Sequence, residues 1–159
     1  MSNVSTVPHI HHKIANTDIT IRPMTLNDTE LESQFVHNLS FETKHNRFLE
    51  GINELSASML KRLCDIDGKT AMAFIATIEH QGKEQQIGVS RYACDPATNE
   101  SEMAITVADE WQQHGIAQLL MTRLIDYAKN TGISTLYSID FANNTAMHQL
   151  AKDLGMSCQ

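Results

Sequence analysis

The sequence lacks several features that would place it in other classes of protein. Its three cysteines, Cys64, Cys94 and Cys158, are odd in number and form no CxxC pair. This pattern argues against a disulfide framework or a zinc site and predicts reduced thiols in a cytoplasmic protein. No apolar run approaches the roughly 20 residues that span a bilayer, and the first residues lack the pattern of a signal peptide.

Basic residues are also scarce. The chain has 12 lysines and arginines against 19 acidic residues, which gives a formal net charge of −7. Nucleic acids and anionic membranes need a basic surface, so the charge argues against both as partners. It is compatible with a cationic acceptor such as an amine.

What is present suits one compact domain. The chain has 159 residues, 42% of them hydrophobic, and we find no internal repeat or low-complexity tract. Residues 1–17 show no periodicity, and His9, His11 and His12 lack a nearby carboxylate or cysteine that would complete a metal site. We therefore predict a flexible, solvated arm over 1–17, a single domain over 18–159, and no metal.

The hydrophobic pattern predicts the order strand, helix, helix, three strands, helix, strand, helix. This order favours an α/β (α+β) fold with a mixed, mostly antiparallel sheet and helices on both faces. The segment 40–48 is open to two interpretations, a solvated helical continuation or the border of a substrate cleft. The expected strands are 19–22, 71–78, 87–94, 100–107 and 135–141, and the expected helices begin near Thr25, Ser56, Ile116 and Asn144.

The stretch 100–122 carries most of the functional information. It reads as a strand, a tight loop with one glycine, and an amphipathic helix. Unpaired amides and the helix dipole make such a helix start a binding site for anions.

Two motifs carry a resemblance to a known family. The loop Gln112-Gln-His-Gly-Ile-Ala117 follows a strand and opens a helix. It resembles the signature Q/R-x-x-G-x-G/A of the GNAT superfamily of acyl-CoA-dependent N-acetyltransferases. The later run from Asn144 through Met147 and Leu150 to Gly155-Met156 resembles the Asn-bearing segment that ends in Gly-Phe. The likeness covers residues 18–156. Segments 40–48, 66–67, 87–92 and 102–104 look similar to the acetyltransferase domain of bacterial protein-lysine acetyltransferases.

The resemblance implies that acetyl-CoA lies in a V-shaped opening beside the strand 100–107, with no metal and no covalent enzyme intermediate. It implies main-chain contacts to the pantetheine arm from Ile105, Thr106 and Val107, with an N–H near Val107 polarising the thioester. It places the pyrophosphate on Gln112, Gln113, His114, Gly115, Ile116 and Ala117, and Asn144 near the pantetheine.

The loop departs from the family at two positions, because Gln113 and His114 stand where lysine or arginine is common. We expect phosphate binding to depend on amides and the helix dipole, and to strengthen when His114 is protonated. A titration of acyl-CoA binding between about pH 5.5 and about pH 8 would test this.

Glu102 is the candidate general base. An attacking lysine amine titrates near ~10.4, so a group must remove its proton. Glu102 shares a strand face with Ala104 and Thr106; the alternative is a glutamate that only contacts solvent.

The tyrosine that serves as general acid in many GNAT enzymes is Ala151 here. Tyr137, Tyr92 and His148 are candidate substitutes, and the CoA thiolate can also leave without a dedicated acid.

The resemblance also implies two further strands after the Gly-Phe segment. The sequence ends three residues after Met156, so we expect these strands to be missing. Either the protein is shortened here, or a partner chain covers the edge of the sheet through a homodimer or domain exchange. The expected function is transfer of an acetyl group from acetyl-CoA to a primary amine, with a protein lysine as acceptor. The alternatives are a small amine acceptor, such as a polyamine or amino sugar, and a non-catalytic acyl-CoA-binding or sensory module.

Overall fold

The computed structural model describes residues 4–48, 55–138 and 144–157. The strands are β1 (Ile10–Ile14), β2 (Thr17–Pro23), β3 (Ala71–His80), β4 (Lys83–Asp95), β5 (Glu100–Val107) and β6 (Leu136–Tyr137). The helices are α1 (Thr29–His37), α2 (Phe41–Phe48), α3 (Ala57–Cys64), α4 (Ile116–Asn130) and α5 (Thr145–Asp153). Three short 3-10 helices are η1 (Val4–Thr6), η2 (Leu26–Asp28) and η3 (Asp109–Trp111). No helix in these ranges is long and apolar enough to cross a membrane.

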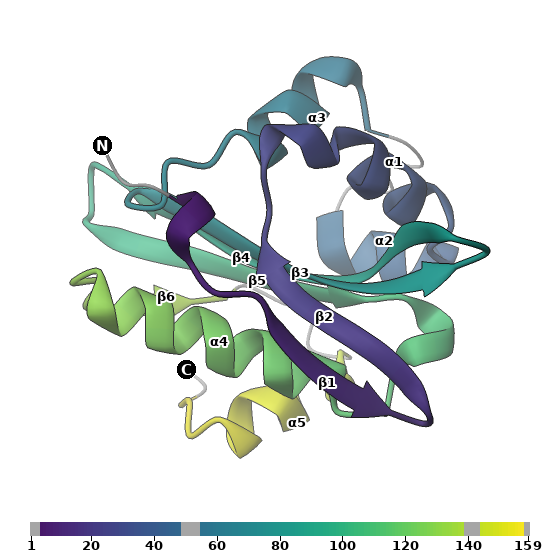
Figure 1. Cartoon of the computed structure of the whole chain (residues 1–159). Coiled ribbons are helices and arrows are strands. Elements are labelled where there is room, and N and C mark those ends of the chain that lie inside the picture. Colours follow the sequence, from purple (N-terminus) through teal and green to yellow (C-terminus); the bar gives the residue numbers. More distant parts are fainter. Residues whose placement is uncertain (1–3, 49–54, 139–143, 158–159) are drawn as a thin grey trace.

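The six strands form one sheet in sequence order. Strands β1 to β5 are antiparallel to their neighbours, and β6 pairs in parallel with the beginning of β5. Helices α1, α2 and α3 cover one face and helices α4 and α5 lie on the other (Figure 1). The predicted mixed, mostly antiparallel sheet with helices on both faces is confirmed.

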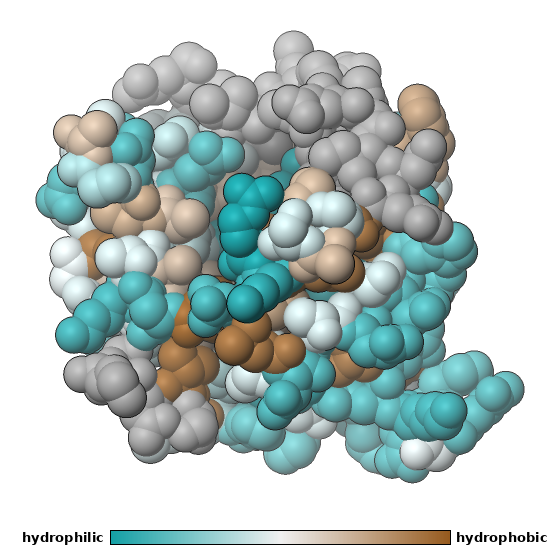
Figure 2. All heavy atoms as spheres, turned by 90° about the horizontal axis from the view of Figure 1, so that it is seen from above, coloured by the Kyte–Doolittle hydropathy of each residue, from teal (hydrophilic) through white to brown (hydrophobic). Residues whose placement is uncertain are grey.

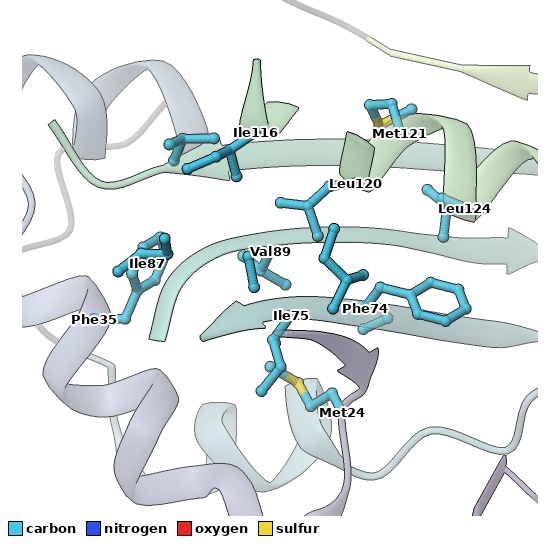
Figure 3. Close-up of a cluster of buried hydrophobic side chains, with 14 of the residues drawn as sticks. Met24, Phe35, Phe74, Ile75, Ile87, Val89, Ile116, Leu120, Met121 and Leu124 are labelled. Atoms are coloured by element: carbon cyan, nitrogen blue, oxygen red, sulfur yellow. The ribbon is translucent and has the colours of Figure 1, made fainter. Parts of the chain in front are cut away.

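The core fixes the start of α4 against the end of β5. Side chains of α4 and of the strands point toward one another in a closely packed cluster (Figure 3). The helix approaches β4 closely, because a Cβ at Gly88 would lie 2.9 Å from Cδ1 of Leu120. Ser90 Oγ donates a hydrogen bond to the carbonyl of Leu120 at 3.0 Å. This packing holds α4 in a fixed position, with its N-terminus beside the loop after β5.

The N-terminal segment differs from the prediction of an arm over 1–17. Residues 10–14 form β1, which pairs along its whole length with β2. Ala15 and Asn16 connect the strands with φ angles of 51° and 63°, the values of a two-residue hairpin turn in which both residues are left-handed. Ile10 and Ile14 are half-buried against the rest of the molecule.

The predicted helix starts are present. Thr25 and Asp28 form a capping box, and the Ser56 hydroxyl accepts the N–H of Met59 at 3.2 Å. Segment 40–48 is a separate helix, α2, rather than a continuation of α1. Of the strand predicted over 135–141, residues 136 and 137 are paired, and residues 139–141 lie outside the described ranges.

Candidate active site

The main chain of β5 is used differently on its two sides. The N–H of Ser101 donates to Thr135 at 3.1 Å, toward β6, and that of Ala108 donates to Ile87 at 2.8 Å, toward β4. Because strand residues alternate in direction, the main chain of Met103, Ile105 and Val107 points toward the side of β6. Among the described residues, however, strand β6 pairs only with Ser101 and Glu102. In the described part of the chain, β5 therefore has an open edge formed by the main chain of Met103, Ile105 and Val107.

Gln112 occupies one group of this open edge. Its Nε2 donates to the carbonyl of Val107 at 3.1 Å, so a ligand along the edge would use Met103, Ile105 and the N–H of Val107. Thr106 was expected to offer its main chain to the pantetheine arm. Strand alternation instead directs the main chain of Thr106 to β4. Its side chain is buried on the face covered by α1.

The loop between β5 and α4 presents the start of a helix to solvent. Gly115 is the N-cap residue with φ 84° and contributes no side-chain cap, and Gln113 also has a positive φ of 64°. Ile116 is 1% exposed and anchors the first turn in the core, while Gln113, His114 and Gly115 are exposed. The first amides of α4 thus lie at an accessible, uncapped helix start, which favours an anion.

His114 is held against an aromatic neighbour. Its ring contacts the Trp111 ring edge-on, with centroids 5.8 Å apart. Ala117 follows in the first turn of α4 and is half-buried. The Oδ1 of Asn144 accepts the N–H of Met147 at 3.3 Å and caps α5, as predicted.

Glu102 lies where the pairing of β5 with β6 stops. Its side chain is exposed and shares a face with Ala104 and Thr106, toward α1, α2 and α3. Tyr137 is its partner in the parallel register. Desolvation, and then the negative charge of Glu102, raises the pKa of the Tyr137 phenol, so this hydroxyl is protonated and can donate at neutral pH.

Helix α2 brings a cation to the same face. Burial, with the nearby charge of Arg91, lowers the pKa of Arg47 to about 10, while Glu32 and Glu102 act in the opposite direction. Arg91 is itself paired with Glu32 at 2.5 Å. Arg47, Arg91, Glu32 and Thr106 line a cavity of about 10 Å³, about the space that is needed to admit one water. Figure 2 views this side of the molecule, where hydrophobic side chains are exposed between hydrophilic ones.

Comparison with known proteins identifies the family. The profile described as "Acetyltransferase (GNAT) family" matches residues 34–156. Acetyltransferase PA5475 of Pseudomonas aeruginosa is 42% identical over 137 residues, which is 86% of this chain and 74% of that protein. The chain belongs to the GNAT acetyltransferase family.

Solved structures agree with this assignment. The GNAT domain of S. lividans PAT superposes with a TM-score of 0.82 at 25% identity, covering 92% of this chain and 86% of that one. A cAMP-binding acyltransferase from Mycobacterium smegmatis gives a TM-score of 0.64 at 22% identity. It matches 95% of this chain but only 44% of its own length is covered, so this second likeness supports the GNAT fold alone.

The three candidates for a general acid lie in different surroundings in this GNAT fold. Tyr92 is buried, its hydroxyl donates to the carbonyl of Lys69 at 3.4 Å, and desolvation raises its pKa to about 12. His148 is exposed on α5. Of the three, Tyr137 is the residue paired with Glu102.

Sequence reasoning did not single out Arg47 or Asp109 as parts of this GNAT site. Arg47 is an ordinary charged residue in a polar helix, and no local pattern indicates that it faces Glu102. Asp109 directly follows the strand and precedes the loop motif, which is a usable signal. Its partners, however, lie 66 and 69 residues earlier in the chain.

Proposed function

We propose that this GNAT protein transfers the acetyl group of acetyl-CoA to a primary amine by direct attack on the thioester. The observation that carries the proposal is one continuous arrangement on β5. The uncapped start of α4 at Gly115 stands at one end, the open edge runs from Val107 back to Met103, and Glu102 lies where β6 closes the edge.

Each part of this arrangement suits a part of the donor. The amides at the start of α4 would bind the pyrophosphate, with Gln113 and His114 beside it. An extended arm would pair with the main chain of Met103, Ile105 and Val107 as an added strand does. Five residues at ~3.3 Å give an edge of roughly 16 Å, which ends next to Glu102.

The chemistry follows from the groups at the closed end. Glu102 would accept a proton from the acceptor ammonium, directly or through water, so that the neutral amine can attack. The amine nitrogen adds to the thioester carbon, and open-edge amides stabilise the resulting oxyanion. The C–S bond breaks when this oxyanion collapses to the amide. Tyr137, whose phenol is protonated, is the residue that can return a proton to the departing sulfur.

We further propose a protein lysine as the acceptor. The resemblance of segments 40–48, 66–67, 87–92 and 102–104 to the acetyltransferase domain of bacterial protein-lysine acetyltransferases supports a protein substrate. Phe41 of α2, on the Glu102 side of the sheet, is 72% exposed and offers an aromatic surface to a polypeptide rather than to a small polyamine. The net charge of −7 is compatible with any cationic acceptor and does not separate the two classes.

Thiol release from acetyl-CoA, measured over a panel of proteins, lysine peptides, polyamines and amino sugars, tests this function. We expect release to depend on a protein or peptide lysine, with acetyl-lysine found by mass spectrometry. Release with small amines only would replace the acceptor. Acyl-CoA binding with no release on any amine would favour a non-catalytic module.

A homodimer remains part of the proposal, and light scattering that shows a concentration-independent monomer would contradict it.

A further inference from the structure

We propose that Ser40, Thr43, Asp109 and Gln112 form a latch that positions helix α2 over the acceptor side of β5 and joins it to the loop that holds the acyl donor. The latch rests on the proposed function, since it assigns a role to the segment that borders Glu102. Its members come from two parts of the chain, the first turn of α2 and the connection between β5 and α4.

Asp109 is the centre of the latch. Its Oδ2 accepts the main-chain N–H of Ser40 at 2.8 Å, and its Oδ1 accepts the hydroxyls of Ser40 at 2.8 Å and Thr43 at 2.7 Å. Burial alone would raise the pKa of Asp109, but these hydrogen bonds outweigh burial and lower it. Asp109 is therefore ionised at neutral pH, and hydrogen bonds to a charged acceptor are the stronger kind.

These bonds orient the helix rather than create it. Helix α2 already has a local cap, because the Ser40 hydroxyl accepts the N–H of Thr43 at 3.2 Å. The contacts from Asp109 are additional, and they connect the helix to the residue that leaves β5. Removing Asp109 should therefore release the orientation of α2 more than its helical structure.

Gln112 extends the latch to the donor side. Its Nε2 lies 3.5 Å from Thr43 Oγ1 and donates to the carbonyl of Val107 at 3.1 Å. One side chain amide thus touches both α2 and the open edge of β5, and it belongs to the first residue of the loop motif.

The other end of α2 reaches the candidate base. Arg47, in the last turn of this helix, lines the same cavity as Thr106 of β5, and its charge interacts with that of Glu102. Helix α2 therefore packs against β5 on the side of Glu102 and is fixed at its N-terminal end by the latch. The position of α2 determines how an acceptor amine approaches Glu102. The main-chain contacts of β5 to the acyl donor do not involve α2.

Replacement of Asp109 by alanine tests the latch, with Glu110→Ala as the matched control. Glu110 is the next residue in η3, is exposed, and is not a latch member. We expect Asp109→Ala to raise the acceptor KM at least about fivefold, as loss of hydrogen bonds to a charged group would. Acyl-CoA affinity should stay within about twofold, and Glu110→Ala should match the wild type in both. Thr43→Val should act in the same direction, and combining it with Asp109→Ala should add less than the two single effects together.

Amide hydrogen exchange keeps this test separate from that of the proposed function. In Asp109→Ala we expect faster exchange in α2 than in the wild type, with α4 unchanged and the thermal transition still cooperative. If exchange in α2 is faster in Asp109→Ala but the wild-type protein itself releases no thiol on any amine, the latch is supported and the proposed function is rejected. Unchanged exchange in α2, or an acceptor KM that does not move in a folded variant, would overturn the latch.

Discussion

Gly115 and Gly132 lie at the two ends of α4. Substitutions at both positions can distinguish backbone strain from the loss of a ligand contact. Both have a positive φ, 84° and 87°, and a Cβ at either position would meet no atom within 4 Å. Alanine should therefore cost each position a similar ~1–2 kcal/mol of folding free energy. Only Gly115 stands at the helix start where the pyrophosphate would approach.

We accordingly expect Gly115→Ala to weaken acyl-CoA binding well beyond the effect of Gly132→Ala. Calorimetric titration with CoA, combined with urea denaturation of both variants, measures the two effects. Equal binding by the two variants would place the phosphate site elsewhere.

Two ion pairs allow the contribution of a buried ionic contact to be compared with that of an exposed one. Arg22 and Asp28 are 2.7 Å apart with side chains only 12% and 6% exposed, whereas Lys13 and Asp18 are 3.9 Å apart and 67% and 87% exposed. Removing the Asp28 carboxylate takes one of two carboxylate partners from Arg22, which keeps Glu84 at 3.0 Å. Loss of hydrogen bonds to a charged group costs about 2 kcal/mol. An exposed pair contributes at most about 1 kcal/mol.

Asp28→Asn should therefore lower the free energy of unfolding by about 2 kcal/mol. Asp18→Asn should change it by less than about 1 kcal/mol. Urea denaturation at neutral pH decides between these values, and similar losses in both variants would contradict the assignment.

At the scale of elements, the caps of α3 and α5 provide a matched comparison. Ser56 and Asn144 each accept one first-turn N–H, at 3.2 and 3.3 Å, so alanine at either site should cost about 1 kcal/mol. Asn144 is also predicted to contact the pantetheine arm. We expect Asn144→Ala to weaken CoA binding while Ser56→Ala does not, by calorimetric titration. Equal CoA affinity would leave Asn144 as a cap alone.

The same scale shows what sequence could predict. Caps, glycine stops and hydrophobic periods are local, so β5, α4 and the starts of α3 and α5 could be read directly. The β1–β2 hairpin was missed because its turn is Ala15-Asn16 and alanine is not a usual left-handed turn residue. Helix α2 begins at a local cap, Ser40, but its orientation could not be predicted, since the carboxylate that orients it, Asp109, is 69 residues away.

The candidate site divides in the same way. Gly115 and Glu102 follow from a motif and from strand alternation. The restriction of the open edge to odd-numbered residues required the hydrogen bonds of Ser101 and Ala108, which depend on neighbouring strands. Pairing of Tyr137 with Glu102 likewise depends on the register of two distant segments.

For the whole molecule, acidic pH should reduce stability through several carboxylates. Burial alone would raise the pKa of Asp28. The hydrogen bonds from Arg22 and Thr25 and the charge of Arg22 outweigh burial, so the pKa is lowered. Four hydrogen bonds from Lys69, Thr70 and Ala71 outweigh desolvation and lower the pKa of Asp67 to about 2. Each folded-state value lies below the unfolded value of ~3.9, so these ionised groups stabilise the folded state above about pH 4.

That contribution should disappear as the pH falls from about 4 toward about 2. We expect urea denaturation at stepwise pH to show the free energy of unfolding falling over this range, with a smaller slope in Asp28→Asn. An unchanged slope in that variant would show that Asp28 does not carry the acid sensitivity.

The central claim is that Glu102 receives the proton of the attacking amine, and thiol release by Glu102→Gln tests it most directly. Glu100→Gln is the control, because Glu100 is exposed on the same face of the same strand two residues earlier. We expect Glu102→Gln to lower kcat by about 10²-fold or more, as loss of a general base does, with acyl-CoA affinity retained and Glu100→Gln active. A Glu102→Gln protein that releases thiol at the wild-type kcat would contradict the account.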